Sequence, residues 1–370
     1  MKQNKTRKLG YYLNTLLTIF IFLFVTTKIG SDSLRAEAAW EKISSINANR
    51  ITSLEKTPWG ILAGEFDSRT FLQPPPNNAL FLSRDSGETW EKIGLDERGI
   101  LDIKYYAGKI YVATYYVVNN SYGIFVSEDG GTTWYNIWNG PSTNEIDRDS
   151  ETIYVGSTSY GPYVSSDNGL TWRKVFDSSG RELEVLALES SEDITLVSLP
   201  THVYKTTDHG ETWSEIDQLK NKSIISFCIN GNVIFAGSRV TEGLYISTNG
   251  GETWVKVSSF GNNGVNKITY LNGRYYTIKY SFEDYKYYIY VSSDTGKTWV
   301  SSDPNMSSAD RMMDLLPISS SDQPFILASV LINGIYRYDI PTETVKSPFL
   351  KIPWNYEDEN EVTDKITSFF

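Results

Sequence analysis

Charged and aromatic side chains interleave in several short segments between the apolar, strand-like stretches of this chain, and these residues are the ones best suited to binding chemistry. A tyrosine ring packs on apolar patches of a sugar or peptide while its hydroxyl group finds a hydrogen-bond partner. We therefore expect a surface that recognises a protein or a glycan, although the same side chains could simply cap the ends of loops. The predicted ligand-binding residues are Asp67, Arg69, Tyr115, Tyr116, Tyr160, Arg239, Glu242 and Tyr285.

No set of catalytic or metal-binding groups stands out. Glycoside hydrolysis needs two carboxylates that flank the scissile bond, and no such pair is recognisable. The two histidines, His202 and His209, do not support a metal site. The single cysteine, Cys228, allows no internal disulfide and lies in an apolar stretch, so we expect a small buried side chain rather than a nucleophile. We predict neither a metal nor a cofactor.

The elements that must position these segments are marked by a repeated motif, Ser/Thr-x-Asp/Asn-x-Gly-x-Thr-Trp. Its six copies have their acidic positions 44, 38, 41, 41 and 45 residues apart, a period that suits one four-stranded blade of a β-propeller. The carboxylate can accept hydrogen bonds from turn amides and the glycine supplies a positive φ, as in a hairpin. We therefore expect a structural role for the acidic position, which is occupied by Asp85, Asp129, Asp167, Asp208, Asn249 and Asp294.

The motif resembles the Asp-box, or bacterial neuraminidase repeat, in which the hairpin joins the third and fourth strands of a blade and the tryptophan packs under its neighbours. The short blades, with Ala63-Gly64, Val155-Gly156 and Ala236-Gly237 in their second strands, look like propellers of the photosystem II assembly-factor type. This resemblance covers residues 40–340. Members of that superfamily range from assembly factors to hydrolases and receptors, so the resemblance implies the fold more strongly than the function.

A resemblance to sialidases raises an enzymatic alternative. The stretch Arg50-Ile51-Thr52-Ser53-Leu54 is similar to the Arg-Ile-Pro-x-Leu stretch that supplies one of the three carboxylate-binding arginines of sialidases. Asp67 falls near the position of their acid/base aspartate, and Arg239 and Arg311 are the best candidates for the other two arginines. The proline is replaced here, a Tyr/Glu nucleophile pair is not recognisable, and sialidases have six blades. We expect non-catalytic binding, with a sialidase-like glycoside hydrolase using Arg50 and Asp67 as the alternative.

The order of expected strands predicts an all-β, seven-bladed propeller. Six blades carry the motif, and residues 312–318, 324–331 and 334–340 then have the pattern of three further strands with no fourth. At the other end of the chain, Trp40-Glu41-Lys42-Ile43 repeats the segment Trp90-Glu91-Lys92-Ile93 that begins a fourth strand. We therefore expect residues 40–44 to complete the last blade, which closes the ring and leaves no unpaired edge.

The ends of the chain predict its location. Lys2, Lys5, Arg7 and Lys8 precede an apolar run from about residue 16 to residue 25, and Ala36-Glu37-Ala38 offers a cleavage site. We therefore expect residues 1–38 to be a signal peptide or an uncleaved membrane anchor. Residues 39–345 would form the propeller. Residues 346–370 would be a tail, either a helix that packs back on the ring or the start of a further domain.

Net charge limits the possible partners. The formal net charge is −11, and such a surface repels phosphate backbones and anionic membrane faces. We therefore expect no nucleic acid as partner and no membrane contact beyond the N-terminal anchor. The sequence as a whole predicts a bacterial extracellular protein, secreted or anchored at the cell surface, whose partner is an extracellular protein or polysaccharide.

Overall fold

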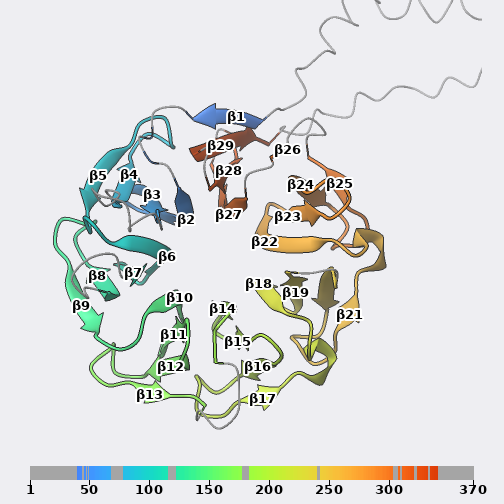
Figure 1. The fold of residues 1–370 in the computed structure, drawn as a ribbon, viewed down its shortest axis with the longest axis horizontal. Coiled ribbons are helices and arrows are strands. Elements are labelled where there is room, and N and C mark those ends of the chain that lie inside the picture. The colour runs from blue at the N-terminus through green and yellow to red at the C-terminus, as the bar shows by residue number, and fades with distance from the viewer. Residues whose placement is uncertain are drawn as a thin grey trace, which may run out of the picture. The chain divides into compact units, whose positions relative to one another are not determined.

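Seven antiparallel sheets surround a central channel in the computed structural model (Figure 1). The structure describes residues 40–43, 46, 48, 50–67, 78–115, 122–176, 183–239, 242–302, 307–308, 311–320, 323–331 and 334–340. Six sheets each pair their strands in chain order, so each of them is one blade. The seventh sheet combines three strands from the end of the described chain with one from its beginning. The predicted all-β, seven-bladed propeller is confirmed.

In every blade the first strand lies nearest the channel and the later strands follow outward (Figure 1). The first three blades contain β2 (Ile51–Thr57), β3 (Gly60–Glu65), β4 (Leu80–Ser83) and β5 (Glu91–Gly94); β6 (Gly99–Tyr106), β7 (Lys109–Tyr115), β8 (Gly123–Ser127) and β9 (Tyr135–Trp138); and β10 (Thr143–Arg148), β11 (Ile153–Ser157), β12 (Gly161–Ser165) and β13 (Arg173–Lys174). The next two contain β14 (Ala187–Ser190), β15 (Thr195–Ser198), β16 (Val203–Thr206) and β17 (Ser214–Glu215), followed by the 3₁₀ turn η1 (Asp217–Leu219); and β18 (Ile224–Asn230), β19 (Val233–Ser238), β20 (Leu244–Ser247) and β21 (Val255–Lys256), followed by η2 (Ser258–Phe260). The sixth blade contains β22 (Gly264–Leu271), β23 (Arg274–Ser281), β24 (Lys286–Ser292) and β25 (Val300–Ser301), and β26 (Ser307–Ser308) also pairs with β24.

The seventh blade is closed by the N-terminal strand, as predicted. It contains β27 (Met312–Ile318), β28 (Phe325–Val330) and β29 (Gly334–Asp339), and β1 (Trp40–Ile43) pairs antiparallel with β29 so that Trp40 opposes Tyr338. The two rings stack with their centroids 5.1 Å apart, and the indole N–H of Trp40 donates to Ser302 Oγ at 3.1 Å. Since Ser302 follows the last strand of blade six, Trp40 also links the closing strand to the neighbouring blade. The expected leader and tail lie outside the described residues.

The core of the propeller lies between blades. Seven clusters of buried apolar side chains occur in the described chain, one at each junction between neighbouring blades. Glycines in the second strands allow this close packing, because a Cβ atom on Gly64, Gly156 or Gly237 would lie 2.4–2.7 Å from an Ile or Val side chain of the next blade. The Ala-Gly and Val-Gly pairs of the sequence are therefore packing devices.

The Asp-box turns form the hydrogen bonds expected of a structural motif. In the first box, Asp85 Oδ1 accepts from the backbone N–H of Thr89 at 2.8 Å and from Ser83 Oγ at 2.8 Å, and Oδ2 accepts from Thr89 Oγ1 at 2.5 Å. The indole N–H of Trp90 donates to the Gly87 carbonyl oxygen at 3.0 Å. The same carboxylate contacts recur in the other four boxes that carry an aspartate, so the motif satisfies its own turn groups.

These hydrogen bonds stabilise the ionised carboxylates. The threonine hydroxyl and N–H groups lower the pKa of five box aspartates to about 2, and these are Asp85, Asp129, Asp167, Asp208 and Asp294. The fifth box keeps the turn with a neutral side chain: Asn249 Oδ1 accepts from the N–H of Thr253 at 3.0 Å, and its amide nitrogen donates to the threonine hydroxyl at 3.0 Å. A negative charge is therefore not required for the turn.

Candidate binding site at the channel mouth

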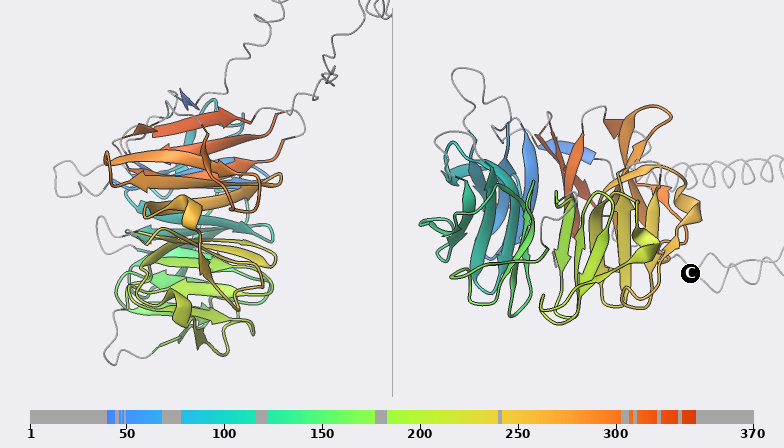
Figure 2. Two further views of the ribbon diagram at one scale, coloured as in Figure 1. Left: turned by 90° about the vertical axis from the view of Figure 1, so that its right-hand side faces the viewer. Right: turned by 60° about the horizontal axis from the view of Figure 1, so that its bottom comes forward.

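The two faces of the ring are built from different connections, because the strands run back and forth between them (Figure 2). The Asp-box turns join third and fourth strands at one face, which we call the Asp-box face. The connections from second to third strands, and from each blade to the next, lie at the other face, which we call the loop face. Those predicted ligand-binding residues that the structure describes belong to connections of the loop face, at or next to the strand ends.

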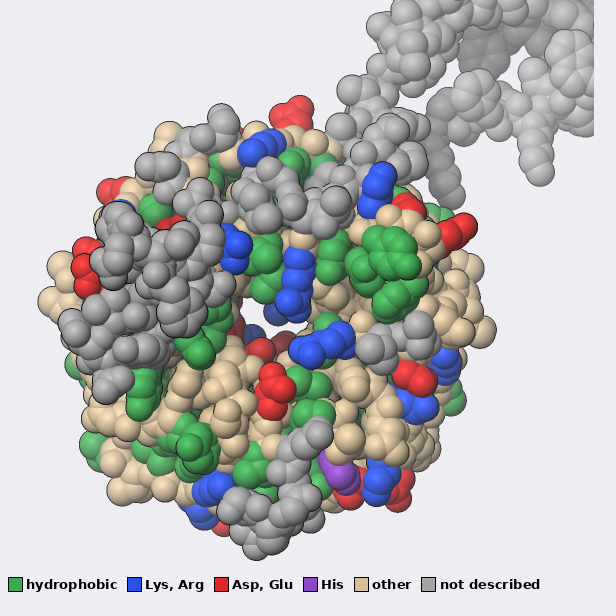
Figure 3. Space-filling view, in the orientation of Figure 1, with side chains coloured by type: hydrophobic (Ala, Val, Ile, Leu, Met, Phe, Trp, Pro, Cys, Tyr) green, Lys and Arg blue, Asp and Glu red, His purple; other side chains and the backbone are tan. Residues whose placement is uncertain are grey.

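A cavity of about 400 Å³ occupies the channel at the loop face, and residues of all seven blades line it. Its lining is rich in charge of both signs. The cationic residues are Arg50, Arg239, Arg311 and Lys267, and the acidic ones are Asp102, Glu145, Glu189 and Asp314. Figure 3 shows Lys and Arg side chains at the edge of the central opening, with acidic side chains beside them. The cavity therefore suits a charged ligand rather than an apolar one.

Three arginines from three blades converge on this cavity. Arg50 precedes β2 and Arg311 precedes β27, which are inner strands, whereas Arg239 follows β19, the second strand of its blade. All three lie at the loop-face ends of these strands. Arg50 Nε lies 3.7 Å from Asp67 Oδ1, in an ion pair with a carboxylate that has no exposed surface. Arg239 and Arg311 are exposed, and within the described chain neither guanidinium group has an ion pair or a hydrogen bond. Two cationic groups are thus available at the mouth.

Deeper in the channel, aspartates on the inner strands join each blade to the next. Asp102 Oδ2 accepts the N–H of Ile146 in the following blade at 3.0 Å. Asp314 Oδ2 does the same with the N–H of Leu54 at 2.8 Å. Lys267 Nζ also lies 3.2 Å from Asp314 Oδ1, which compensates that charge. These carboxylates are therefore already used in holding the ring together.

A second lysine compensates the neighbouring carboxylates. Lys104 Nζ lies 3.5 Å from Asp147 Oδ2 and 3.7 Å from Glu189 Oε2. Asp147 Oδ2 also accepts the N–H of Ser190, in the next blade, at 2.8 Å. Burial nevertheless raises the pKa of Asp147 to about 6 and that of Glu55 to about 8. The channel wall therefore disfavours additional negative charge.

Glu145 differs from these residues. It follows a bulge in β10 and lines the cavity, yet the described residues offer its carboxylate no hydrogen bond and no ion pair. Burial, together with the nearby Asp102, raises the pKa of Glu145 well above its ordinary value. Glu145 is thus an acidic group of the cavity wall without an ion pair, and only the more distant Lys267 and Lys104 offset its charge.

The predicted ligand-binding residues occupy different environments. Arg239 lines the cavity, Tyr160 and Tyr285 are 53% and 69% exposed, and Tyr115 packs against Phe66 with ring centroids 5.3 Å apart. Glu242 Oε2 pairs with Lys222 Nζ at 3.1 Å. Arg69 and Tyr116 lie outside the described residues.

Asp67, predicted to bind a ligand or to act as the acid/base group, is buried. Its backbone N–H donates to Asn78 Oδ1 at 2.7 Å, and its carboxylate faces Arg50. Because the carboxylate has no exposed surface, this geometry supports a role in positioning Arg50 and does not support direct contact with a ligand or proton transfer to it.

Sequence reasoning missed the acidic residues of the channel wall. Asp102, Glu145 and Asp314 each follow a bulge in an inner strand, and in sequence they look like ordinary polar positions of an alternating strand. The sequence signal that could have identified them is the recurrence of charged residues at this strand position, since the corresponding residue of blade six is Lys267. Charged residues at one register position of several inner strands mark the lining of a channel.

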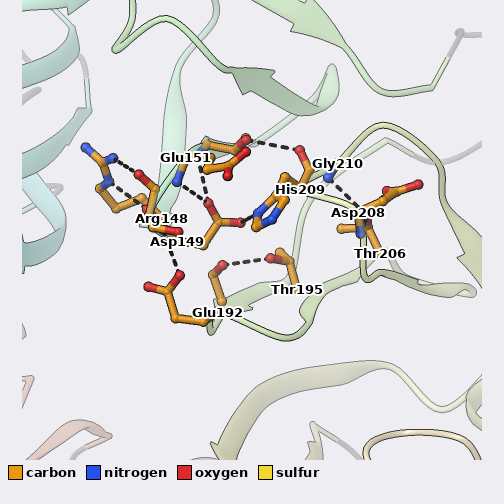
Figure 4. Close-up of polar contacts among 12 residues, drawn as sticks. Arg148, Asp149, Glu151, Glu192, Thr195, Thr206, Asp208, His209 and Gly210 are labelled. Carbon is orange, nitrogen blue, oxygen red and sulfur yellow. Dashed lines mark hydrogen bonds and ion pairs between the residues drawn. The ribbon is translucent and has the colours of Figure 1, made fainter.

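A second polar cluster lies at the Asp-box face, between blades three and four (Figure 4). Asp149 accepts hydrogen bonds from Tyr154 Oη at 2.7 Å and from the N–H of Thr152 at 2.7 Å, and His209 Nδ1 lies 3.0 Å from its Oδ2. The hydrogen bond to Asp149 raises the pKa of His209. Arg148 bridges to Tyr111 Oη at 2.8 Å. Since every one of these groups is paired with a neighbour, the cluster fastens adjacent blades.

Other classes of site find little support in the described chain. Within it, no group of three or more His, Cys, Asp or Glu side chains is arranged to hold a metal ion. Cys228 is buried, and burial raises the pKa of its thiol, so it does not behave as a nucleophile. A helix long and apolar enough to cross a membrane is also absent from the part of the chain that the structure describes.

Comparisons with known proteins agree with the fold. A sequence model of the BNR/Asp-box repeat matches residues 245–256, which include the fifth motif. No curated protein matches the chain. Among solved structures, YCF48 from Cyanidioschyzon merolae superposes with a TM-score of 0.61 at 15% identity, covering 83% of this chain and 100% of that one. This chain is thus a seven-bladed β-propeller that carries BNR/Asp-box repeats, and its fold is similar to that of YCF48.

Two further structures show how the same fold serves different proteins. YCF48 bound to D1 peptide has a TM-score of 0.59 at 13% identity, covering 82% of this chain and 97% of that one. The GH74 xyloglucanase from Xanthomonas campestris has a TM-score of 0.59 at 14% identity, covering 81% of this chain and 53% of the enzyme. At such identities the similarity establishes the propeller fold alone.

Proposed function

We propose that this propeller is an extracellular binding module that recognises an anionic group of a protein or polysaccharide at the mouth of its channel, without catalysing a reaction. The observation that carries this proposal is the convergence of Arg50, Arg239 and Arg311 on one cavity. Arginine suits this task because its planar guanidinium group can bind a carboxylate through two parallel hydrogen bonds. A closed ring of seven blades holds the three residues on a rigid frame.

The charge distribution supports an anionic ligand at this position. The chain carries a formal net charge of −11, so a cationic mouth differs in sign from the protein as a whole. Exposed cationic side chains at the rim raise the local concentration of anionic ligands there. The exposed rings of Tyr160 and Tyr285, on the same face, would add contacts for the body of a ligand.

The similar structures agree with this kind of partner. One is described with a bound peptide, and another is a xyloglucanase, whose name indicates a polysaccharide substrate. The extracellular location rests on the expected signal peptide or anchor in residues 1–38. The alternative function, glycoside hydrolysis, is less well supported, because the acid/base candidate Asp67 has a carboxylate with no exposed surface.

The experiment that separates the two functions combines turnover and binding. The purified chain would be incubated with fluorogenic sialosides and with plant and bacterial polysaccharides, and in parallel applied to arrays of glycans and of peptides with free C-termini. Binding without turnover is the expected result. Turnover that is abolished by both Arg50→Ala and Asp67→Ala would replace the binding proposal with the hydrolase.

A further inference from the structure

The cavity is polarised along the channel axis. In the inner strands of blades one and seven, the first residues after the bulge are Ser53 and Asp314. Arg50 and Arg311 each lie three residues before them. Glu145 occupies the same register position in blade three, opposite Gly156 as Ser53 is opposite Gly64. At about 3.3 Å per strand residue, with one residue taken up by the bulge, this places the arginine backbones about 7–10 Å along the strand direction from the level of Glu145.

The ionisable groups of the cavity that lack an ion pair are of opposite kinds at these two levels. At the rim, Arg239 and Arg311 have no anionic partner within the described chain. Below them, Glu145 has neither an ion pair nor a hydrogen bond in the described chain, and Lys267 and Lys104 act on it only from a distance. Asp314 has Lys267 at 3.2 Å and Glu189 has Lys104 at 3.7 Å, and Asp102 accepts the N–H groups of Ile103 and Ile146. The carboxylate of Glu145 is therefore the acidic group of the cavity wall that is best placed to take a positive charge from a ligand.

Burial disfavours the charged form of Glu145, and a cationic ligand group beside it relieves that cost, whereas the exposed Arg239 and Arg311 offer hydrogen-bond donors to an anionic group. A ligand carrying only a carboxylate would satisfy the rim and leave Glu145 uncompensated. A ligand with a carboxylate and, a few bonds away, an ammonium or guanidinium group would satisfy both levels. The four-carbon stem of lysine ends in a compact ammonium group and spans a distance comparable to that between the two levels.

We propose that the channel mouth binds a basic amino acid through its free carboxylate and its cationic side chain, the carboxylate at Arg239 and Arg311 and the cationic group at Glu145. The source of this chemistry is either the C-terminal lysine or arginine of a polypeptide or the free amino acid. This inference rests on the proposed function. It narrows the class of ligand from anionic groups in general to groups that carry both a negative and a positive charge.

Calorimetric titration of the full chain at low ionic strength tests the inference without altering the protein. The probes are an acetylated pentapeptide that ends in lysine, the same peptide as its C-terminal amide, the same peptide ending in norleucine, and free L-lysine. We expect the lysine peptide to bind at least tenfold more tightly than both the amide and the norleucine peptide. Free lysine that binds as tightly as the peptide identifies the amino acid as the ligand, and weaker binding identifies the chain terminus.

Variants assign the two levels separately. Glu145→Gln is expected to reduce the affinity for the lysine peptide to the affinity that the wild type has for the norleucine peptide. The affinity for the norleucine peptide is expected to stay unchanged in this variant. The control Glu211→Gln, an exposed residue of the Asp-box face, is expected to have no effect. The double variant Arg239→Ala/Arg311→Ala is expected to weaken binding of both peptides. Circular dichroism and thermal unfolding establish that each variant is folded.

The outcomes distinguish this inference from the proposed function. Equal affinity for lysine and norleucine peptides, with dependence on the two arginines, would refute the role of Glu145 and leave anion binding intact. An acidic polysaccharide that binds more tightly than all four probes, again through the arginines, would also overturn the basic-residue assignment. Absence of any arginine-dependent binding, to these probes or to the arrays, would refute both.

Discussion

Replacing Trp40 with alanine should open the ring at its one junction between the two ends of the propeller chain. The Trp40 side chain is 8% exposed, stacks on Tyr338 with ring centroids 5.1 Å apart, and donates a hydrogen bond to Ser302. Truncation of a buried tryptophan costs about 3–5 kcal/mol, through lost burial and the cavity that remains. Much of the stability of a typical domain, about 5–15 kcal/mol, would be lost with this one side chain.

The assay is thermal unfolding of the purified chain, followed by calorimetry. For a domain of about 300 residues, a loss of 3–5 kcal/mol corresponds to a fall in Tm of about 5–8 °C. Lys42→Ala, at an exposed position of the same strand, is the matched control and should leave Tm within about 1 °C. Trp40→Phe should fall between the two, because it keeps a ring and loses the indole N–H. Equal Tm values for Trp40→Ala and Lys42→Ala would refute ring closure through β1 as a source of stability.

Three further predictions concern the blades and the channel wall. The folded state lowers the pKa of the box aspartates to about 2, so their stabilising effect is complete above pH 4 and is lost as the pH falls towards 2. The free energy of unfolding in urea should therefore decrease over this pH range. Asp208→Asn, which reproduces the side chain found at Asn249, should make this decrease smaller. Burial raises the pKa of Glu55 to about 8, so the contribution of its protonated carboxyl group to stability should be lost as the pH rises from about 4.5 to 8. If the free energy of unfolding of Glu55→Gln kept the full wild-type pH dependence in this range, the assignment would be contradicted. Gly237→Ala should lower the free energy of unfolding in urea by about 1–3 kcal/mol, because its Cβ would lie 2.5 Å from Val265 Cγ1. Adding Val265→Ala should restore part of this loss. If the effects of the two substitutions on the free energy of unfolding were fully additive, the clash would not be the cause.

The fold could be predicted because its determinants are local and repeated. Each Asp-box satisfies its turn groups through contacts within about four residues, so the motif specifies a hairpin wherever it occurs. The period of the copies then gives the size of a blade, and the orphan fourth strand at Trp40 gives the closure. These features depend on neighbours in sequence and not on the arrangement of the ring.

The candidate site could be predicted only in part, because it depends on contacts between blades. Arg50, Arg239 and Arg311 are separated by 72 or more residues, and only a weak resemblance joined them in the sequence. Glu145 was missed because its lack of an ion pair depends on the positions of Lys104 and Lys267, which pair with Asp147 and Asp314 instead. Asp67 was predicted to contact a ligand, but its carboxylate has no exposed surface and its backbone N–H donates to the Asn78 side chain. A loop residue of suitable chemistry is thus not always accessible.

The central claim is that the arginines at the channel mouth bind an anionic ligand. The most direct test compares the wild-type chain, Arg239→Ala/Arg311→Ala, and the surface control Arg84→Ala on an array of carboxylated polysaccharides and peptides with free C-termini. Arg84 is exposed and pairs with Glu91, away from the cavity. We predict that wild type and Arg84→Ala bind the same members of the array and that the double variant loses at least tenfold in affinity for them. Binding that is unchanged in a folded double variant would contradict the account.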